Sequence, residues 1–391
     1  MVTQVGVGIS HHRNPRQAGY EAAQQALNIA NITKPDFILL FSTVGYSPRT
    51  LLDSVRSTLG YAPLIGCSGE GVIVQGEADE SNFSVAVMVV QSAQIRLSYG
   101  AVPGLSQDSA VVGNRVGQFL AQHDSSDAIA NFLFADGISC DFDQLISALE
   151  DQFNRANQVP LLGGLSADNY AMTRTYQYCD DTILTDGVVW ATLAGKAQVA
   201  WSISHGCVPL GNKYTVTRSQ NNQIFELDHQ PALEILRQYL LDEELENWEL
   251  ALRNLGLGLK SQDAFQNYDA FFVRSMIARN LETGSITIPT EISAGTDVWM
   301  MRRDQGKTQA GIHKIAAELL EALGESTPQF VIQLECAGRV GDTQKRALLA
   351  TLQSAIGPTV PWIGFYPYGG IGPLNGQNCF HNHADIVIVL Y

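Results

Sequence analysis

A repeated strand–helix–strand pattern constrains this chain more than any other feature of its sequence. Each copy consists of an apolar strand-like run, a segment with helical periodicity and a Pro-apolar-apolar-Gly step; the copies span residues 36–66, 131–163 and 329–364. In the third copy the helix is expected over residues 342–356. Each copy has about the 30-residue size of a strand–helix–strand crossover. Chance could produce so short a motif, but three copies in the same context favour a structural repeat.

The repeat also indicates where a ligand could bind. If the flanking strands pair in parallel, the loops that follow the Pro-apolar-apolar-Gly steps lie at carboxyl ends of strands, where α/β sheets tend to hold ligands. These loops carry Cys67, Ser68, Gly164, Ser166 and Tyr366. Such turns can direct N–H groups and small hydroxyls at a carboxylate or phosphate, although an ordinary strand-end turn has the same residues. We expect the three loops to converge on one side of the molecule.

The rest of the chain adds antiparallel character. Asn221-Asn222 separates two strand-like runs and predicts a hairpin, and residues 384–391 form the continuous apolar run of a strand buried on both faces. Together these patterns predict a mixed α/β (α+β) fold with two related halves, large mixed sheets flanked by helices, and repeated strand–helix–strand units. We place the two domains at residues 1–229 and 230–391.

Charge and composition exclude several classes of function. The chain has 24 Lys and Arg against 39 Asp and Glu, a net charge of −15, and lacks the basic stripe of a nucleic-acid binder. Its apolar runs fall well short of the roughly 20 residues that cross a bilayer, and its N-terminal residues lack a signal-peptide pattern. Its six cysteines form no Cys-x-x-Cys pair, which argues against a disulfide framework or a zinc ribbon. We expect a cytoplasmic protein without membrane insertion.

Several short motifs occur in a characteristic order along the whole chain. They are VGVGIS at 5–10, LIGCSG at 64–69, LLGGLSAD at 161–168, GCVPLG at 206–211, CAGR at 336–339, GFYPYG at 364–369 and HNH at 381–383. In this order they resemble the FIST family, with its N-terminal and C-terminal FIST domains in tandem. The sequence departs from the family pattern at Gly370, where a glutamate is usual, and at Ala384, where a threonine is usual.

The resemblance implies a sensory protein that binds a small ligand, proposed for the family to be an amino acid or a related metabolite. The sequence shows no catalytic motif, so we expect no enzymatic activity. Because the match leaves no segment for an output module, a signalling partner would have to act in trans. A subset of the family is associated with haem and nitric-oxide sensing.

Candidate ligand-binding residues cluster in the C-terminal part of the chain. Tyr366 and Tyr368 combine apolar rings with polar tips, which suits a small-molecule pocket, although core packing explains them equally well. Arg339, close to Cys336, presents a planar fork suited to a carboxylate, and a structural ion pair is its equally plausible alternative. We expect an apolar pocket near Tyr366, Tyr368 and Arg339.

The histidines and cysteines suggest two further classes of site. His381 and His383 are two residues apart, so on a strand they share a face, but the spacing supplies no third metal ligand and we expect no metal site. Haem remains open because it needs only one axial imidazole and an apolar slot. Cys67 and Cys336 are more simply buried side chains than nucleophiles. The main hypothesis is therefore a non-enzymatic small-ligand sensor, and the alternatives are a haem-based gas sensor and a cysteine-dependent enzyme.

Overall fold

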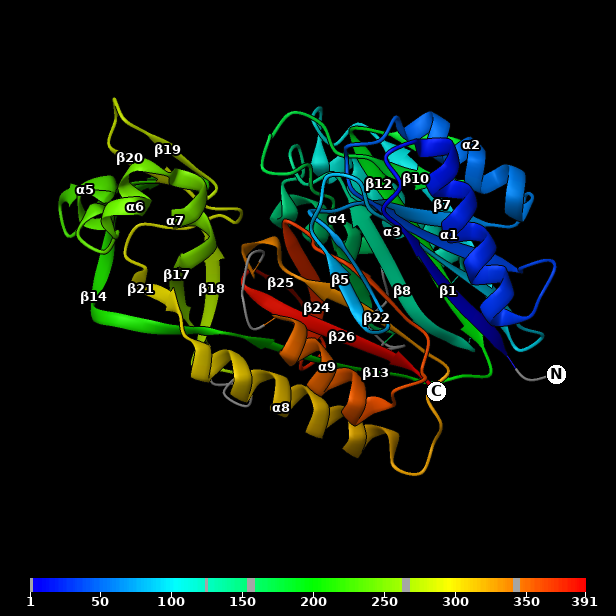
Figure 1. The fold of residues 1–391 in the computed structure, drawn as a ribbon. Coiled ribbons are helices and arrows are strands. Elements are labelled where there is room, and N and C mark those ends of the chain that lie inside the picture. The colour runs from blue at the N-terminus through cyan, green and yellow to red at the C-terminus, as the bar shows by residue number, and fades with distance from the viewer. Residues whose placement is uncertain (1–2, 124–125, 153–158, 262–267, 340–344) are drawn as a thin grey trace.

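The computed structural model describes residues 3–123, 126–152, 159–261, 268–339 and 345–391 (Figure 1). It shows a mixed fold in which strands and helices alternate in three similar units. The first unit contains, in chain order, β1 (Gln4–Ser10), α1 (Pro15–Ala30), β2 (Phe37–Ser42), α2 (Pro48–Leu59), β3 (Leu64–Ser68) and β6 (Val85–Gln91). Its strands form a sheet in the order β1-β6-β2-β3, with β2 and β3 parallel and the other pairs antiparallel.

The second and third units repeat this order and pairing. The second has β7 (Ile95–Pro103), α3 (Ser109–His123), β8 (Ala128–Ala135), α4 (Phe142–Gln152), β9 (Leu161–Leu165) and β12 (Gly187–Gly195). The third has β13 (Val199–His205), α8 (Gln305–Leu323), β22 (Phe330–Glu335), α9 (Lys345–Ile356), β23 (Trp362–Phe365) and β26 (Ala384–Leu390). Their sheets run β7-β12-β8-β9 and β13-β26-β22-β23, and again the last two strands of each are parallel.

Each unit also lends a hairpin to the sheet of another unit. The hairpins are β4 (Val72–Val74) with β5 (Glu77–Asp79), β10 (Gln177–Cys179) with β11 (Thr182–Leu184), and β24 (Gly369–Leu374) with β25 (Gln377–His381). Strand β4 pairs with β23, β10 with β3, and β24 with β9. This exchange joins the three units into one structure, which we call the body.

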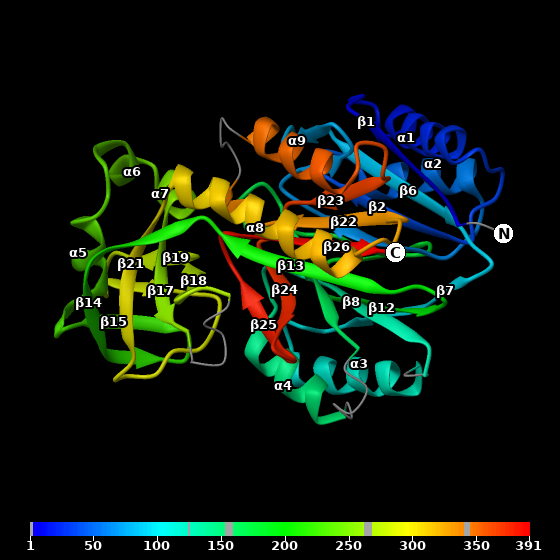
Figure 2. The same ribbon diagram turned by 90° about the horizontal axis from the view of Figure 1, so that it is seen from below.

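A shared apolar core fills the centre of the body. Phe41 stacks on Phe365 at 4.6 Å between ring centres, and Phe134 meets both rings edge-on at 5.5 and 5.9 Å. These rings come from all three units and belong to one buried cluster. Three further clusters each join one sheet to its own helices, and Figure 2 shows the pairs α1/α2, α3/α4 and α8/α9 outside the strands.

The glycine of the repeated Pro-apolar-apolar-Gly step has a steric reason. Gly66 and Gly163 have φ values of 155° and 145°, a region that favours glycine. A Cβ at either position would overlap the carbonyl oxygen of the neighbouring strand, at Leu40 and Leu133 respectively. The repeat is therefore a packing requirement between paired parallel strands.

The third unit differs because a second structure, the lobe, lies between its first strand and its first helix. The lobe contains β14 (Cys207–Gln220), β15 (Gln223–Leu227), β16 (Gln230–Pro231), α5 (Ala232–Arg237), α6 (Asp242–Glu246), α7 (Trp248–Asn254), β17 (Leu255–Lys260), β18 (Phe271–Ser275), β19 (Ala278–Asn280), β20 (Ser285–Thr287) and β21 (Asp297–Arg303). Its sheet is antiparallel, in the order β18-β17-β21-β14-β15-β20-β19. Figure 1 shows the lobe beside the body, joined to it by β14 and by the passage from β21 to α8.

The predicted fold class is confirmed, with large mixed sheets flanked by helices and repeated strand–helix–strand units. The predicted hairpin at Asn221-Asn222 joins β14 to β15, and Asn221 has a φ of 53°. The helix expected over residues 342–356 is observed from Lys345, and residues 342–344 lie outside the described part of the chain. The division at 229/230 stays a prediction; β13, which precedes it, pairs with β26 near the end of the chain.

Candidate functional site

The three loops that follow the Pro-apolar-apolar-Gly steps meet at one end of the body, as predicted. The Ser68 hydroxyl donates to the carbonyl of Ala167 at 2.8 Å, which joins the first loop to the second. The Glu70 N–H donates to the carbonyl of Tyr366 at 3.0 Å, which joins the first to the third. The Tyr368 N–H donates to the carbonyl of Leu165 at 2.9 Å and completes the set.

A cavity of about 440 Å³ lies between this end of the body and the lobe. The body contributes the loop after β8 (residues 137–141), residues 336–338 after β22, and side chains that include Leu165, Tyr170, Tyr368 and Phe380. The lobe contributes side chains that include Asn221, Trp248, Glu249, Leu252, Ile277 and Glu291. The volume is within the range of small-molecule sites. We call this cavity the cleft.

Two tyrosines of the cleft are held in place by two buried carboxylates. The Tyr368 hydroxyl donates to Asp168 Oδ1 at 2.7 Å and accepts from the Tyr170 N–H at 2.7 Å. The same N–H also lies 2.9 Å from Glu70 Oε1. Burial raises the pKa of Glu70 to about 7, against the opposing effect of its hydrogen bonds with Tyr170 and Tyr368. Glu70 therefore changes its charge close to neutral pH.

The predicted site residues fall into two groups. Tyr368 and Cys336 line the cleft. The other eight are buried and are not among its described lining residues: Cys67, Ser68, Gly164, Ser166, Arg339, Tyr366, His381 and His383. Ser166 Oγ donates to the carbonyl of Ala135 at 2.8 Å, and the Lys345 ammonium lies 3.4 Å from the centre of the Tyr366 ring. Ligand contact by these buried residues stays a prediction.

Arg339 is buried next to residues 336–338 of the cleft. Its side chain is 5% exposed, and its Nε lies 3.1 Å from Glu335 Oε1. The pocket expected near Tyr366, Tyr368 and Arg339 is present beside Tyr368 and the residues that precede Arg339, but neither Arg339 nor Tyr366 is among its described lining residues. The geometry therefore favours the structural ion pair for Arg339.

The two histidines near the C-terminus are buried. Burial lowers the pKa of His381 and of His383 to about 3, so both are neutral at pH 7. His381 Nε2 lies 2.9 Å from the carbonyl of Gly372. Within the described ranges, no group of three or more His, Cys, Asp and Glu side chains is arranged to hold a metal ion. No described lining residue of the cleft is a histidine, so the cleft does not fit a histidine-ligated haem.

The cysteine thiols show no activation. Burial raises the pKa of Cys67 well above its usual value. Burial also raises the pKa of Cys336, although hydrogen bonds from the N–H groups of Gly338 and His383 and from the Asn382 side chain act in the opposite direction. A nucleophilic cysteine needs a lowered pKa. The cysteine-dependent enzyme thus gains no support from these two thiols.

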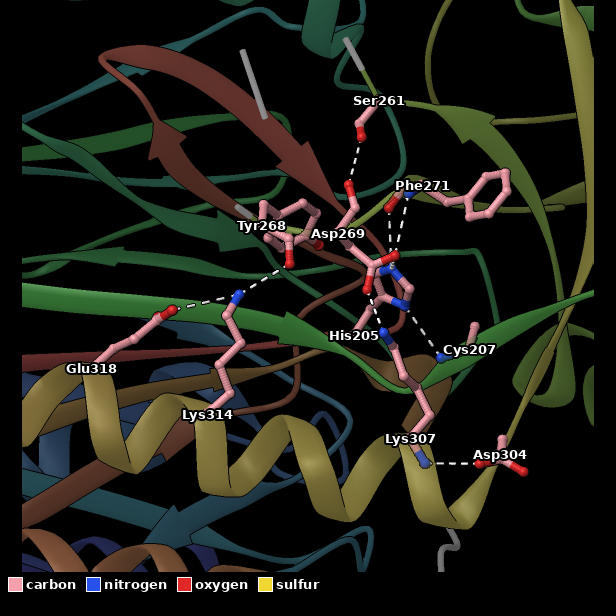
Figure 3. A network of polar contacts seen from close by, with 10 residues as sticks. All are labelled: His205, Cys207, Ser261, Tyr268, Asp269, Phe271, Asp304, Lys307, Lys314 and Glu318. Atoms are coloured by element: carbon pink, nitrogen blue, oxygen red, sulfur yellow. Dashed lines mark hydrogen bonds and ion pairs between the residues drawn. The ribbon is translucent and has the colours of Figure 1, made fainter. Parts of the chain in front are cut away.

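A polar network, which we call the latch, connects the lobe to the body (Figure 3). Asp269 Oδ2 in the lobe lies 2.5 Å from Lys307 Nζ on α8. His205 at the end of β13 accepts the Cys207 N–H at Nδ1 (3.2 Å), so its Nε2 carries the proton and donates to the carbonyl of Phe271 at 3.0 Å. Burial alone would raise the pKa of Asp269, but His205 and Lys307 outweigh it and hold that pKa well below its usual range.

Several residues of the cleft were not singled out from the sequence. Trp248 and Glu249 come from the lobe, and no sequence pattern indicated that the lobe would face the repeat loops. Glu70 and Asp168 had a usable signal, because each lies just after the glycine-rich turn of its repeat. Buried carboxylates at predicted strand ends are candidates for a functional site.

Comparisons with known proteins agree with this architecture. The chain belongs to the FIST family: the FIST N domain matches residues 36–230 and the FIST C domain matches residues 232–373. FIST domains are generally small-ligand sensory domains. An uncharacterized protein of Mycobacterium tuberculosis is 26% identical over 386 residues, which are 97% of each chain. An uncharacterized protein of Methanocaldococcus jannaschii is 22% identical over 84% of this chain and 64% of its own.

Two solved structures show a distant likeness. A chorismatase covers 100% of this chain and 99% of its own with 9% identity and a TM-score of 0.38. A cyanuric acid hydrolase covers 100% and 99% with 10% identity and a TM-score of 0.35. Likenesses this weak carry no argument about function. Within the described residues, none of the helices combines the length and the apolar character that a membrane crossing requires.

Proposed function

We propose that this protein is a cytoplasmic small-ligand sensor, which binds an amino acid or a related metabolite in the cleft and signals to a partner protein in trans. The observation that carries the proposal is the composition of the cleft. Its walls come from both the body and the lobe, and four aromatic side chains line it: Tyr170, Trp248, Tyr368 and Phe380. Apolar cavities with a few polar groups are typical of small-molecule sites.

The two-sided cleft also suggests how binding becomes a signal. A ligand that touches both walls interacts more strongly with one arrangement of lobe and body than with others, and it shifts the population by that difference in affinity. The latch residues Asp269 and Lys307 lie at the connection across which the shift would act. A partner protein that binds only one arrangement of lobe and body would then respond to the presence of the ligand.

A thermal-shift screen of amino acids and related metabolites tests the proposal, with isothermal titration calorimetry of each hit. Trp248 lines the cleft, whereas Trp299 lies on β21 of the same lobe and packs on Phe271 outside it. We expect a ligand that stabilises the wild type and Trp299→Ala but binds Trp248→Ala at least tenfold more weakly. Equal binding by both variants, or no binding by any metabolite, would contradict the proposal.

A further inference from the structure

The described lining of the cleft carries acidic side chains and no basic ones. Asp141 and Glu291 line it together with Glu249, and no lysine, arginine or histidine is among the described lining residues. Asp141 and Glu291 have no ion-pair partner within the described part of the chain, whereas Glu249 pairs with Arg253 at 2.5 Å. The described lining therefore has more acidic than basic side chains.

Hydrogen bonds hold the two residues Asp141 and Glu291 at the cleft. Asp141 precedes α4 and accepts the Gln144 N–H at 3.1 Å. The Glu291 N–H of the lobe donates to Asp143 Oδ2 in the first turn of α4 at 2.6 Å, which holds Glu291 against the same helix. Both residues thus lie near the start of α4, although they come from the body and from the lobe.

The aromatic rings of the cleft already accept cations from the protein. The guanidinium carbon of Arg279 lies 4.6 Å from the centre of the Trp248 ring, and that of Arg253 lies 5.1 Å from the Tyr170 ring. Neither arginine is among the lining residues. Ring faces attract cations through their quadrupole, and the attraction is stronger where water is excluded. The aromatic rings that line the cleft can attract a ligand cation in the same way.

Further polar groups of the same walls include two buried carboxylates. Asp168 accepts from the Tyr368 hydroxyl, and Glu70 accepts from the backbone N–H of Tyr170. The buried Nε1 of Trp248, which can only donate, and the buried hydroxyl of Tyr170 have no hydrogen-bond partner among the described residues, so both are available to an acceptor group elsewhere on the ligand. An anionic ligand would have to approach these carboxylates with no basic side chain in the described lining to meet it, which is costly in a cavity of low dielectric constant.

We propose that the ligand of the cleft is an organic cation, a primary or quaternary amine with no carboxylate to balance its charge. Its ammonium group is held by the carboxylates of Asp141 and Glu291 and by the aromatic rings of Trp248 and Tyr170. This inference rests on the proposed function and narrows its ligand class. It differs from the earlier expectation that Arg339 binds a ligand carboxylate, because the Arg339 side chain is paired with Glu335.

Three probes that share an aromatic ring and differ in charge test the inference by calorimetry on the full chain: phenethylamine as cation, phenylalanine as zwitterion and phenylpropionate as anion. Choline is the quaternary probe. We expect a cation to bind at least tenfold more tightly than phenylalanine, and phenylpropionate not to bind. Asp141→Asn keeps a good helix cap, and Glu291 is exposed, so both this change and Glu291→Gln preserve the fold. Each should weaken cation binding about tenfold.

Glu282→Gln is the matched control, because Glu282 is an exposed acid of the same lobe that does not line the cleft. It should leave the affinity unchanged. Tighter binding of phenylalanine or phenylpropionate, or unchanged cation binding by Asp141→Asn and Glu291→Gln, would overturn the inference and leave the proposed function standing. If neither these probes nor the wider metabolite screen binds in the cleft, the proposed function itself fails.

Discussion

The body and the lobe are stabilised by different forces. The body encloses one apolar core to which all three units contribute, and each sheet is also covered by its own helices. The lobe has a core of its own and meets the body through polar contacts, such as Asp269 with Lys307 and Arg274 with the carbonyl of Phe380 at 2.9 Å, and through Tyr268, which packs against the body core. Polar contacts of this kind open at a lower free energy than a packed core. The difference makes the body a platform and the lobe the part that can respond to a ligand.

The division into body and lobe arises within the third unit of the repeat. The connection from the first strand to the first helix is residues 11–14 in the first unit and 104–108 in the second, but residues 206–304 in the third. The two short connections only reverse the chain. The long one builds the lobe and one wall of the cleft. The candidate site thus lies where the repeat is broken.

The largest expected effect contrasts the two cores. Phe365→Ala removes a ring that contacts Phe41 and Phe134 at the centre of the body, and it should lower the free energy of unfolding by about 3–5 kcal/mol. Leu257→Ala in the lobe core should cost about 2–4 kcal/mol and act mainly on the lobe. Denaturant unfolding and hydrogen exchange measure both. Equal loss of protection in body and lobe after Leu257→Ala would show that they unfold as one unit.

The second prediction concerns Glu70, a buried carboxylate of the body that is hydrogen bonded to Tyr170 of the cleft. The folded-state pKa of Glu70, about 7, is above the usual value of about 4.3. Glu70 is neutral in both states at low pH, and its ionisation in the unfolded chain lowers stability as the pH rises from about 4.3 to 7. Glu70→Gln should therefore stabilise the protein by up to about 3 kcal/mol at pH 8 and by much less at pH 5. Thermal unfolding at both pH values measures this, and an equal gain at the two would contradict it.

The sequence predicted the body better than the lobe, for a physical reason. The Pro-apolar-apolar-Gly steps carry their own steric requirement, visible at Gly66 and Gly163, and parallel pairing then determines where the loops meet. The exchange of hairpins such as β4 and β10 could not be predicted, because it depends on contacts between units and not on local pattern.

The candidate site was predicted only in part for a related reason. Tyr368 and Cys336 follow strands of the repeat, so strand-end reasoning reached them. Trp248 and Glu291 belong to the lobe, whose docking over the loops no periodicity encodes. For Arg339 the sequence left two alternatives, and the position of Glu335 at the end of β22, four residues earlier, supports the ion pair.

The third prediction concerns a substitution that weakens the contact between the body and the lobe. Asp269→Asn removes a charged partner of Lys307 and His205 and should cost about 2 kcal/mol at pH 7. Because the folded pKa of Asp269 is lowered, its contribution is present above the usual pKa of about 3.9 and is lost as the pH falls below it. Thermal unfolding at pH 7 and pH 3 measures this. The exposed pair of Asp297 and Lys213 in the same lobe is the control, and Asp297→Asn should have a smaller effect.

The smallest effect compares equivalent helix starts in the first and third units. Asn14 caps α1 by accepting the Arg16 N–H at 2.9 Å, and Asp304 caps α8 by accepting the Lys307 N–H at 2.7 Å. Replacing either by alanine should cost about 1 kcal/mol, because one N–H of the first helical turn loses its partner. Only α8 begins where the lobe returns to the body, so only Asp304→Ala should also increase hydrogen exchange in the latch segment 268–271. Increased exchange there after Asn14→Ala would mean that the body transmits local strain to the lobe, and the division between platform and responding part would then not hold.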